Sequence, residues 1–422
     1  METLVRGRSH SDPVAAGLDR GAQTWPVIAM VLLGSALSLI IAAGSLDRQL
    51  ILLATTAGVT LAVSAAWLRS VTWPAIFLGA CGLTAGLAVG VRWLMIDGAS
   101  PSAVAGLIAL ASGVAVVVAS IARMSQRRPA WARALLILSV TLGLAVFVWT
   151  FSPAIIATDV PPIARGETSP NDLGLDAELV RFQTTDGVEI AAWYVPAANG
   201  KTVILRHGSG ETGSSVLPHA AVLTRHGFGV LLADARGHGS SSGEAMGFGW
   251  YGDSDISAAL EYLSTRPEVD IDKVAVVGMS MGGEEALGAI ASDHRIAAVI
   301  AEGATARTDL DKGWLREVYG ARGWIQLKLE WLQYAFTDLL TAAPKPPILA
   351  EAARAARPRP VLLIAGGEIP DEINAAEFIA HEAGDHVSTW VVPGAGHIQG
   401  LSTAPESWER TVISFLDTAM GG

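Results

Sequence analysis

The residues Gly278-Met-Ser280-Met-Gly282 match the pattern G-x-S-x-G, in which a serine sits on a sharp turn. A serine hydroxyl is a weak nucleophile and needs an adjacent base. The bare pattern is weak evidence, because it occurs again at Gly239-Ser-Ser241-Ser-Gly243. Ser280 follows the apolar run Val274–Val277 and precedes a helical pattern, whereas Ser241 has no strand directly before it. This context predicts Ser280 as the nucleophile and Ser241 as part of a polar loop.

The best candidate for the base is His397, at the end of Val392-Pro-Gly-Ala-Gly-His397 after the last predicted strand. A glycine-rich loop at this place can bring an imidazole over the serine. The chain order serine, acid, histidine is also the one known for this kind of triad. By contrast, His381 lies on a predicted helix face, where a solvated side chain is the default.

A carboxylate should hold the imidazole in its productive tautomer, and it should follow the strand Pro360–Ile364. Three acids stand there, namely Glu368, Asp371 and Glu372. Glu372 and Asp371 are favoured about equally, and Glu368 is third because it comes close to the strand. Asp371 and Glu372 begin the next predicted helix, where a carboxylate is also simply a favourable N-terminal residue.

The elements that must position these residues begin at about Asp176, where short β-rich runs alternate with helical patterns. The predicted strands are Leu179–Thr184, Glu189–Val195, Thr202–Arg206, Val230–Asp234, Lys273–Val277, Ala297–Ala301, Pro360–Ile364 and Ser388–Val392. The predicted helices include Ser254–Thr265, Glu284–Ser292, Glu372–Ala383 and Ser407–Thr418. Thr185-Asp-Gly187 predicts an antiparallel opening hairpin, and the alternation predicts an α/β fold with a doubly wound, mostly parallel sheet.

The first part of the chain differs, because it holds five apolar stretches of about spanning length, which is ~20 residues for a helix. They are Trp25–Ser45, Leu50–Leu68, Trp73–Met95, Ser102–Ala122 and Trp131–Phe151. Tryptophans lie at or near several of their ends, as an aromatic belt at a membrane interface predicts. No acidic residue lies at the centre of a stretch, which favours an anchor over a transporter. We therefore expect an all-α transmembrane domain of about five helices.

Charge is divided in the same way. Residues 1–150 carry 10 Arg, no Lys and 5 acids, a net of +5, and residues 151–422 carry 19 basic and 35 acidic residues, a net of −16, which together give −11. The arginines gather in the tail and in the second and fourth loops, which the positive-inside rule places in the cytoplasm. Five spans would then put the second half outside the cytoplasm of a bacterial plasma membrane, and four spans would return it inside. The acidic half argues against a nucleic-acid partner.

These patterns divide the chain into a cytoplasmic tail (1–24), a transmembrane domain (25–151), a linker (152–175) and an α/β domain (176–422). The linker is rich in proline, threonine and small residues, which suits an extended connector. The single cysteine, Cys81, excludes a disulfide within the chain and a structural cysteine zinc site. Neither a metal nor an organic cofactor is implied by any motif.

Four motifs in order make the second half resemble the α/β-hydrolase superfamily, in its esterase and serine-aminopeptidase-like branches. They are Leu205-Arg-His-Gly-Ser-Gly210, Asp234-Ala-Arg-Gly-His-Gly-Ser240, the turn at Ser280 and the loop ending at His397. The resemblance implies an oxyanion hole formed by the backbone N–H groups of Met281 and Ser209. It also implies that His207 and His238 shape loops and are not the base. The chain departs from common members, which have an aspartate where Ile369 stands.

The resemblance also implies that the insertion at about 305–359 is a lid over the substrate. Its aromatic residues, spaced in a helical pattern, suit a lipophilic acyl substrate, although ordinary core packing explains them equally well. The leading hypothesis is a membrane-anchored serine hydrolase that cleaves a carboxylic ester through an acyl-serine intermediate. The alternatives are an amide hydrolase of the serine-aminopeptidase type and a catalytically inactive interaction module.

Overall fold

The computed structural model describes residues 13–41 and 46–421. The chain divides into two compact units, with the boundary between Ile156 and Ala157.

The N-terminal unit is helical. Its elements are α1 (Pro13–Ile41), α2 (Leu46–Leu68), α3 (Trp73–Ala85), the π-helical turn η1 (Gly86–Val91), α4 (Arg92–Asp97), α5 (Pro101–Ser125) and α6 (Ala130–Thr158). Small residues let α5 pack closely on η1, since a Cβ atom on Gly90 would lie 2.5 Å from the carbonyl carbon of Gly106. Such small-residue contacts are typical of helices that pack in membranes.

By length and composition, four helices of this unit could cross a membrane. They are Gln49–Leu68, Trp73–Asp97, Pro101–Ser125 and Ala130–Thr158. The first predicted stretch appears as a shorter apolar helix, Thr24–Ile40, and its expected end at Ser45 lies outside the described residues. The predicted end of the last stretch, Phe151, was too early. The helix continues to Thr158 with Pro153 inside it, because the following residues are again small and apolar.

The second unit is built on one eight-stranded sheet, in the order β1-β2-β4-β3-β5-β6-β7-β8. The strands are β1 (Glu178–Gln183), β2 (Glu189–Val195), β3 (Thr202–Arg206), β4 (Gly229–Ala233), β5 (Val274–Met279), β6 (Ile296–Glu302), β7 (Val361–Gly366) and β8 (Val387–Val392). The β1–β2 and β2–β4 pairs are antiparallel, and the rest of the sheet is parallel. The expected α/β sheet, doubly wound and mostly parallel, is therefore confirmed.

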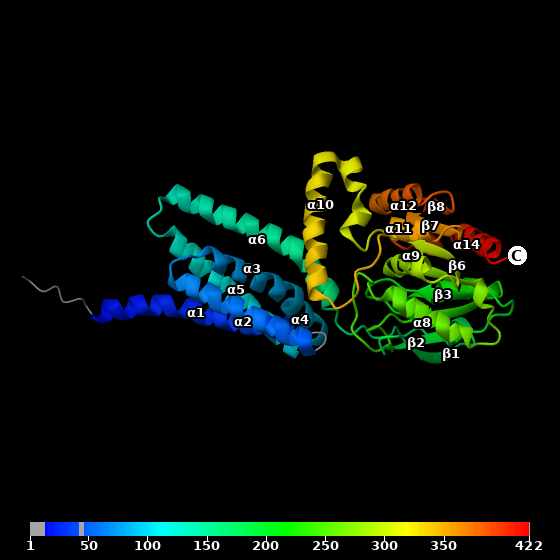
Figure 1. Ribbon diagram of the computed structural model, residues 1–422, viewed down its shortest axis with the longest axis horizontal. Coiled ribbons are helices and arrows are strands. Elements are labelled where there is room, and N and C mark those ends of the chain that lie inside the picture. The colour runs from blue at the N-terminus through cyan, green and yellow to red at the C-terminus, as the bar shows by residue number, and fades with distance from the viewer. Residues whose placement is uncertain (1–12, 42–45, 422) are drawn as a thin grey trace, which may run out of the picture. The chain divides into compact units, whose positions relative to one another are not determined.

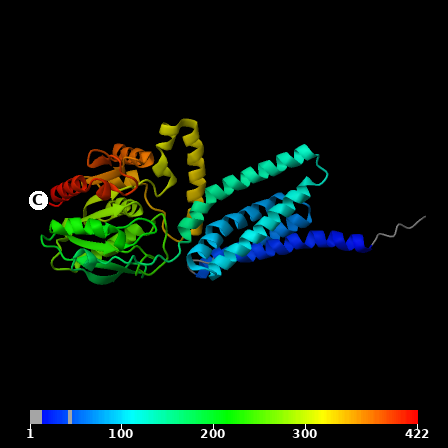
Figure 2. The ribbon, with the colours of Figure 1, turned by 180° about the vertical axis from the view of Figure 1, so that it is seen from behind.

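Helices cover both faces of this sheet. One layer holds α8 (Gly252–Ser264), α9 (Met281–Ser292), α11 (Leu349–Ala355) and α12 (Pro370–Ala383), and the other holds α7 (Leu217–Arg225) and α14 (Pro405–Ala419). Figure 1 and Figure 2 show the sheet between these two layers. Central strands such as β3 and β5 are buried on both faces, which is consistent with the apolar run at residues 203–205 in β3 and the unbroken apolar sequence of β5.

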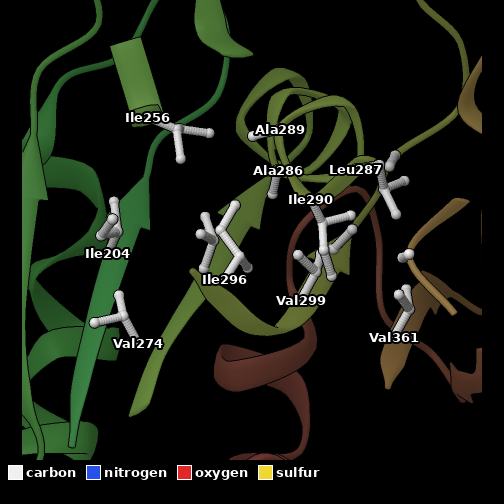
Figure 3. Packing of buried hydrophobic residues seen from close by; sticks show 14 of the residues in the cluster. Ile204, Ile256, Val274, Ala286, Leu287, Ala289, Ile290, Ile296, Val299 and Val361 are labelled. Atoms are coloured by element: carbon white, nitrogen blue, oxygen red, sulfur yellow. The ribbon is translucent and has the colours of Figure 1, made fainter. Parts of the chain in front are cut away.

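The core lies between the sheet and each helical layer. On the α9 side, Ile290 packs beside Val299 of β6, as Figure 3 shows. On the other side, Trp408, Val412 and Leu416 recur every fourth residue along α14 and are all fully buried. A fully buried side chain of this size contributes ~1.5–3 kcal/mol, so these two layers hold the loops at the strand ends in place.

Different parts of the predicted insertion at 305–359 have different surroundings. Its last helix, α11, belongs to the main core through Leu349 and Ala353. Its long helix α10 (Leu315–Leu340) bends at Gly320, where the backbone has φ 56°. Of its aromatic residues, Trp314 and Tyr334 are buried, while Trp324 and Trp331 are exposed. Core packing therefore explains Trp314 and Tyr334, and the lid over the substrate stays a prediction.

Candidate active site

Ser280 lies on the turn between β5 and α9, in a strained backbone conformation with φ 52° and ψ −118°. Two glycines make this turn possible. A Cβ atom on Gly278 would lie 2.1 Å from the carbonyl oxygen of Gly282, and one on Gly282 would lie 2.7 Å from that of Arg206. Positive φ is rare for a residue with a side chain and is found at functional sites. The strain explains why the pattern needs glycine on both sides of the serine.

His397 lies on the loop after β8, and its ring joins two of the predicted residues. Its Nε2 atom is 2.9 Å from Ser280 Oγ, and its Nδ1 atom is 2.6 Å from Glu372 Oε1. The side chain of His397 is about half exposed, whereas that of Glu372 is buried. With Nδ1 donating to the carboxylate, the neutral ring keeps Nε2 as an acceptor for the serine proton.

The three acids that the sequence left open lie in different surroundings. Glu372, in the first turn of α12, reaches His397 with one oxygen and accepts the Gly366 N–H with the other at 2.8 Å. Asp371 is exposed and accepts the Tyr319 hydroxyl at 3.2 Å. Glu368 is also exposed. The structure therefore brings Glu372 together with Ser280 and His397, and it brings neither Asp371 nor Glu368 to the ring.

The charge of Glu372 sets the electrostatics of the ring. Its hydrogen bond raises the pKa of His397 above the ordinary value of 6.5, and this effect outweighs partial burial, which lowers the pKa. A protonated imidazole beside a buried carboxylate is thereby stabilised. The arrangement favours the charged ring that forms when the serine loses its proton.

Two backbone N–H groups were expected to face the developing oxyanion. Met281 is the first residue of α9, so its N–H has no partner within the helix. Ser209 lies on the loop after β3. The neighbouring Gly208 is so close to the nucleophile that a Cβ atom there would lie 3.5 Å from Ser280 Cβ. Met281 thus follows the serine directly in the chain, and Ser209 follows a glycine that lies beside it.

The other histidines and the second serine considered in the sequence make no contact with Ser280 or His397 that the structure records, and they have other surroundings. The Nε2 atom of buried His207 accepts the Ala235 N–H at 2.9 Å and so joins the loops after β3 and β4. Burial lowers the pKa of His207 and of His238. The serine of the second G-x-S-x-G pattern, Ser241, donates to the carbonyl oxygen of Asp234 at 2.8 Å. The side chain of His381 is largely exposed, as expected for a solvated helix face.

The sequence analysis missed Glu302, which is buried beneath the site. Its carbonyl oxygen accepts the Ser280 N–H at 2.7 Å, and its carboxylate accepts from Gly400 N–H at 2.7 Å and Trp408 Nε1 at 2.9 Å. Burial raises the pKa of this carboxyl. One residue thus ties the serine turn to the segment that follows His397. An acid at the end of an apolar strand was the available signal, but the predicted strand stopped one residue earlier, at Ala301.

No group of three His, Cys, Asp or Glu side chains that could hold a metal ion is found within residues 13–41 and 46–421. The hydrogen-bonded side chains of Ser280, His397 and Glu372 offer nucleophilic and acid–base chemistry.

Comparison with known proteins gives a family match over residues 197–359, to the family described as serine aminopeptidase, S33. This range includes Ser280 and ends before Glu372 and His397. The uncharacterized protein Rv2307c of Mycobacterium tuberculosis is 30% identical over 264 residues, which cover 61% of this chain and 84% of that protein. The polyketide transferase grgF of a Penicillium species is 33% identical over 133 residues.

The chain spans less than half the length of several relatives. It matches 43% of the polyketide transferase and 41% of an uncharacterized Salmonella protein. Among solved structures, the Pyrococcus furiosus esterase PF2001 aligns with TM-score 0.50 and 24% identity, over 62% of this chain and 98% of the esterase. That likeness concerns the fold. The family match over residues 197–359, the Mycobacterium relative covered over 84% of its length and the sheet order together show that the chain belongs to the α/β-hydrolase superfamily.

Proposed function

We propose that this chain is a membrane-anchored serine hydrolase that cleaves a carboxylic ester with a lipophilic acyl group. The observation that carries the proposal is the continuous hydrogen-bonded series from Glu372 through His397 to Ser280. In this proposal Ser280 is the nucleophile, His397 the general base and acid, and Glu372 the carboxylate that orients the ring.

The reaction would proceed in two steps. In the first, Ser280 Oγ attacks the ester carbonyl carbon while its proton passes to His397 Nε2. The resulting oxyanion is stabilised by the N–H groups of Ser209 and Met281, and the alcohol leaves with the proton from His397. In the second step, water attacks the acyl carbonyl carbon while its proton passes to His397, the bond from that carbon to Ser280 Oγ breaks, and His397 returns the proton to the serine as the carboxylic acid leaves. The strained, half-buried position of Ser280 on the turn between β5 and α9 supports this role.

The hydrolysis of a neutral ester should depend on pH through His397. The ring must be neutral to accept the serine proton, and the Glu372 hydrogen bond raises its pKa. We expect kcat/KM to rise with pH, with a midpoint above the ordinary value of 6.5. Initial rates at low substrate concentration between about pH 5 and about pH 9 measure this midpoint. A midpoint below the ordinary value would contradict the assigned base.

A lipophilic substrate is supported by the exposed face of α10. Trp324, Ile325, Trp331 and Leu332 recur at helical spacing, and they are 53%, 56%, 55% and 39% exposed. A soluble domain rarely leaves such a row of large apolar side chains uncovered unless it contacts a ligand, partner or membrane. We assign this row, which we call the α10 stripe, to contact with the acyl chain.

Replacing Trp324 and Trp331 together with serine should impair long acyl chains selectively. Each tryptophan offers apolar area that only a long chain can cover. We therefore expect kcat/KM for a decanoate ester to fall roughly tenfold, and that for an acetate ester to change little. Kinetics with a series of p-nitrophenyl esters measures the ratio. Leu179→Ser, which removes an equally exposed apolar side chain from β1, is the matched control. Equal losses for acetate and decanoate would contradict the assignment.

An amide substrate is the second candidate, because the matched family is described as serine aminopeptidase. The acidic second half could receive the cationic N-terminus of a peptide. An ester and an amide with the same aromatic ring in the leaving group distinguish the two candidate functions. Faster hydrolysis of aminoacyl-arylamides than of aryl esters would favour the peptidase.

Membrane anchoring is supported by the four helices of spanning length. A hydrolase domain outside the cytoplasm, which the arginine distribution favours, requires that the shorter apolar helix Thr24–Ile40 also crosses the membrane as a fifth span. Labelling of the full chain tests the orientation. In a Cys81→Ala background, Ser402→Cys places one thiol at an exposed position of the second unit. We expect a membrane-impermeant maleimide to label it in intact cells as fully as in lysed cells. Labelling only after lysis would place the domain in the cytoplasm.

A further inference from the structure

The last two residues of α6 and the segment that follows them are bonded to the loops around the candidate site. We call residues 157–166 the strap. The Gly247 N–H donates to the carbonyl oxygen of Ala157 at 2.7 Å, and the Gly239 N–H donates to that of Ile163 at 2.8 Å. Both donors belong to the loop after β4. A connector that only joined two domains would not need these bonds.

Arg165 is the centre of the strap. Its guanidinium forms an ion pair with Asp234, with Nε 3.1 Å from Oδ2, and lies 4.3 Å from the centre of the Trp193 ring. The Asp234 side chain is fully buried, so its charge depends on this partner. A buried carboxylate that loses its cation is strongly destabilised, because neither water nor another charge replaces it.

The Asp234 carboxylate also accepts hydrogen bonds from two loops. Its Oδ1 atom accepts the Gly213 N–H at 2.8 Å, and its Oδ2 atom accepts the Ser240 N–H at 3.0 Å. Gly213 ends the loop that carries Ser209, the proposed oxyanion donor. One carboxylate therefore fixes the strap, the loop after β3 and the loop after β4 at a single point.

The far end of the strap lies beside the same donor. A Cβ atom on Gly247 would lie 3.2 Å from Ala157 Cα and 3.5 Å from Ser209 Oγ. On the same loop, a Cβ atom on Gly249 would lie 2.7 Å from Met281 Cγ. The loop after β4 thus packs against the strap on one side and against both proposed oxyanion residues on the other.

We propose that Arg165 is a positioning residue, which acts through Asp234 to hold the loop of Ser209 at the distance an oxyanion requires. This inference rests on the proposed function. An oxyanion donor is effective only where its N–H is already aimed at the developing charge. A small displacement of that donor impairs the reaction while substrate binding continues.

The test uses the full chain in detergent or lipid nanodiscs and compares Arg165→Gln with Arg225→Gln. Arg225 also forms an ion pair, with Glu409, but it lies exposed on α7. We expect Arg165→Gln to lower kcat for ester hydrolysis roughly 10- to 100-fold with little change in KM. Affinity for an alkyl trifluoromethyl ketone, which Ser280 converts into a hemiketal oxyanion, should fall by a similar factor. Arg225→Gln should match the wild type in both measurements.

Two further variants keep the test decisive if Arg165→Gln folds poorly. Arg165→Lys restores the charge and should recover part of kcat. Arg165→Gln combined with Asp234→Asn removes both charges and should be more stable to heat than Arg165→Gln alone. Equal kcat and equal ketone affinity in Arg165→Gln and Arg225→Gln would overturn the proposal.

Hydrogen exchange separates this proposal from the proposed function. Arg165→Gln should speed exchange in peptides that contain Gly213 and Ser240, whatever the substrate is. If the wild type hydrolyses no ester but exchange rises, the proposed function fails and the strap still holds the loops. If the wild type hydrolyses esters and neither exchange nor kcat changes, the role of Arg165 is wrong.

Discussion

Ser280→Ala is expected to lower ester hydrolysis roughly 10⁴-fold or more, and to abolish labelling by a fluorophosphonate probe. The hydroxyl is the one atom that would form a covalent bond to the substrate, and His397 Nε2 is positioned 2.9 Å from it. Without the hydroxyl, the remaining donors can stabilise an oxyanion only for direct attack by water. Rates of wild type and variant on one aryl ester, with gel detection of the probe, measure both effects.

The control for Ser280→Ala is Ser402→Ala, which removes an exposed hydroxyl from the same unit and should retain full activity. Peptide mapping of the labelled wild type adds a second check, because the chain has a rival G-x-S-x-G pattern. The label should lie on the Ser280 peptide and not on the Ser241 peptide. Equal labelling of wild type and Ser280→Ala would contradict the nucleophile. An unlabelled wild type would favour an inactive interaction module.

The sheet and the serine turn could be predicted because their signals are local. The ranges of β2 and β3 coincide with the predicted ones, since their apolar runs are bounded by clear turns. The turn at Ser280 is specified by adjacent residues, namely an apolar strand, two glycines and a helix. Strand ends were less accurate, and the missed last residue of β6 concealed Glu302. Local patterns therefore located the serine turn but not the buried Glu302 that supports it.

Contacts between distant residues could not be predicted. Arg165 and Asp234 are 69 positions apart in the chain. Because Arg165 lies among prolines, the sequence predicted it to be part of an extended linker. For the same reason, the sequence could not show which aromatic residues of the insertion at 305–359 are buried. Trp314 is buried and Trp324 is exposed, although both belong to the same helical pattern in the sequence. They differ only because α12 packs against Trp314. Burial is a property of the assembled fold, whereas spacing is a property of the chain.

The orienting acid illustrates this limit most directly, because neighbours on one helix turn point in different directions. Asp371 and Glu372 are adjacent, and successive helix residues lie about 100° apart around the axis. The structure turns Glu372 inward, where it is buried, and leaves Asp371 at the surface near Tyr319. Sequence spacing placed both acids at the correct end of the sheet and could not decide between them.

Glu372→Gln is therefore expected to lower kcat/KM by roughly 10³- to 10⁴-fold. Glutamine has the shape of glutamate, so packing around the Gly366 N–H is kept, but the amide cannot stabilise the charged ring and can hold it in the wrong tautomer. Asp371→Asn and Glu368→Gln remove equivalent charges from the exposed acids on either side. Each should stay within about twofold of wild type, because exposed charges interact weakly through solvent.

The pH profile distinguishes an electrostatic role of Glu372 from a purely structural one. The hydrogen bond from the ring to Glu372 is the largest cause that raises the pKa of His397. Loss of that charge should shift the midpoint of kcat/KM to lower pH, while Asp371→Asn should leave it in place. A variant that was merely destabilised would lose activity without this shift. If Asp371→Asn moved the midpoint and Glu372→Gln did not, the acid would be Asp371, and the hydrogen bond seen to Glu372 would not be the one used in the reaction.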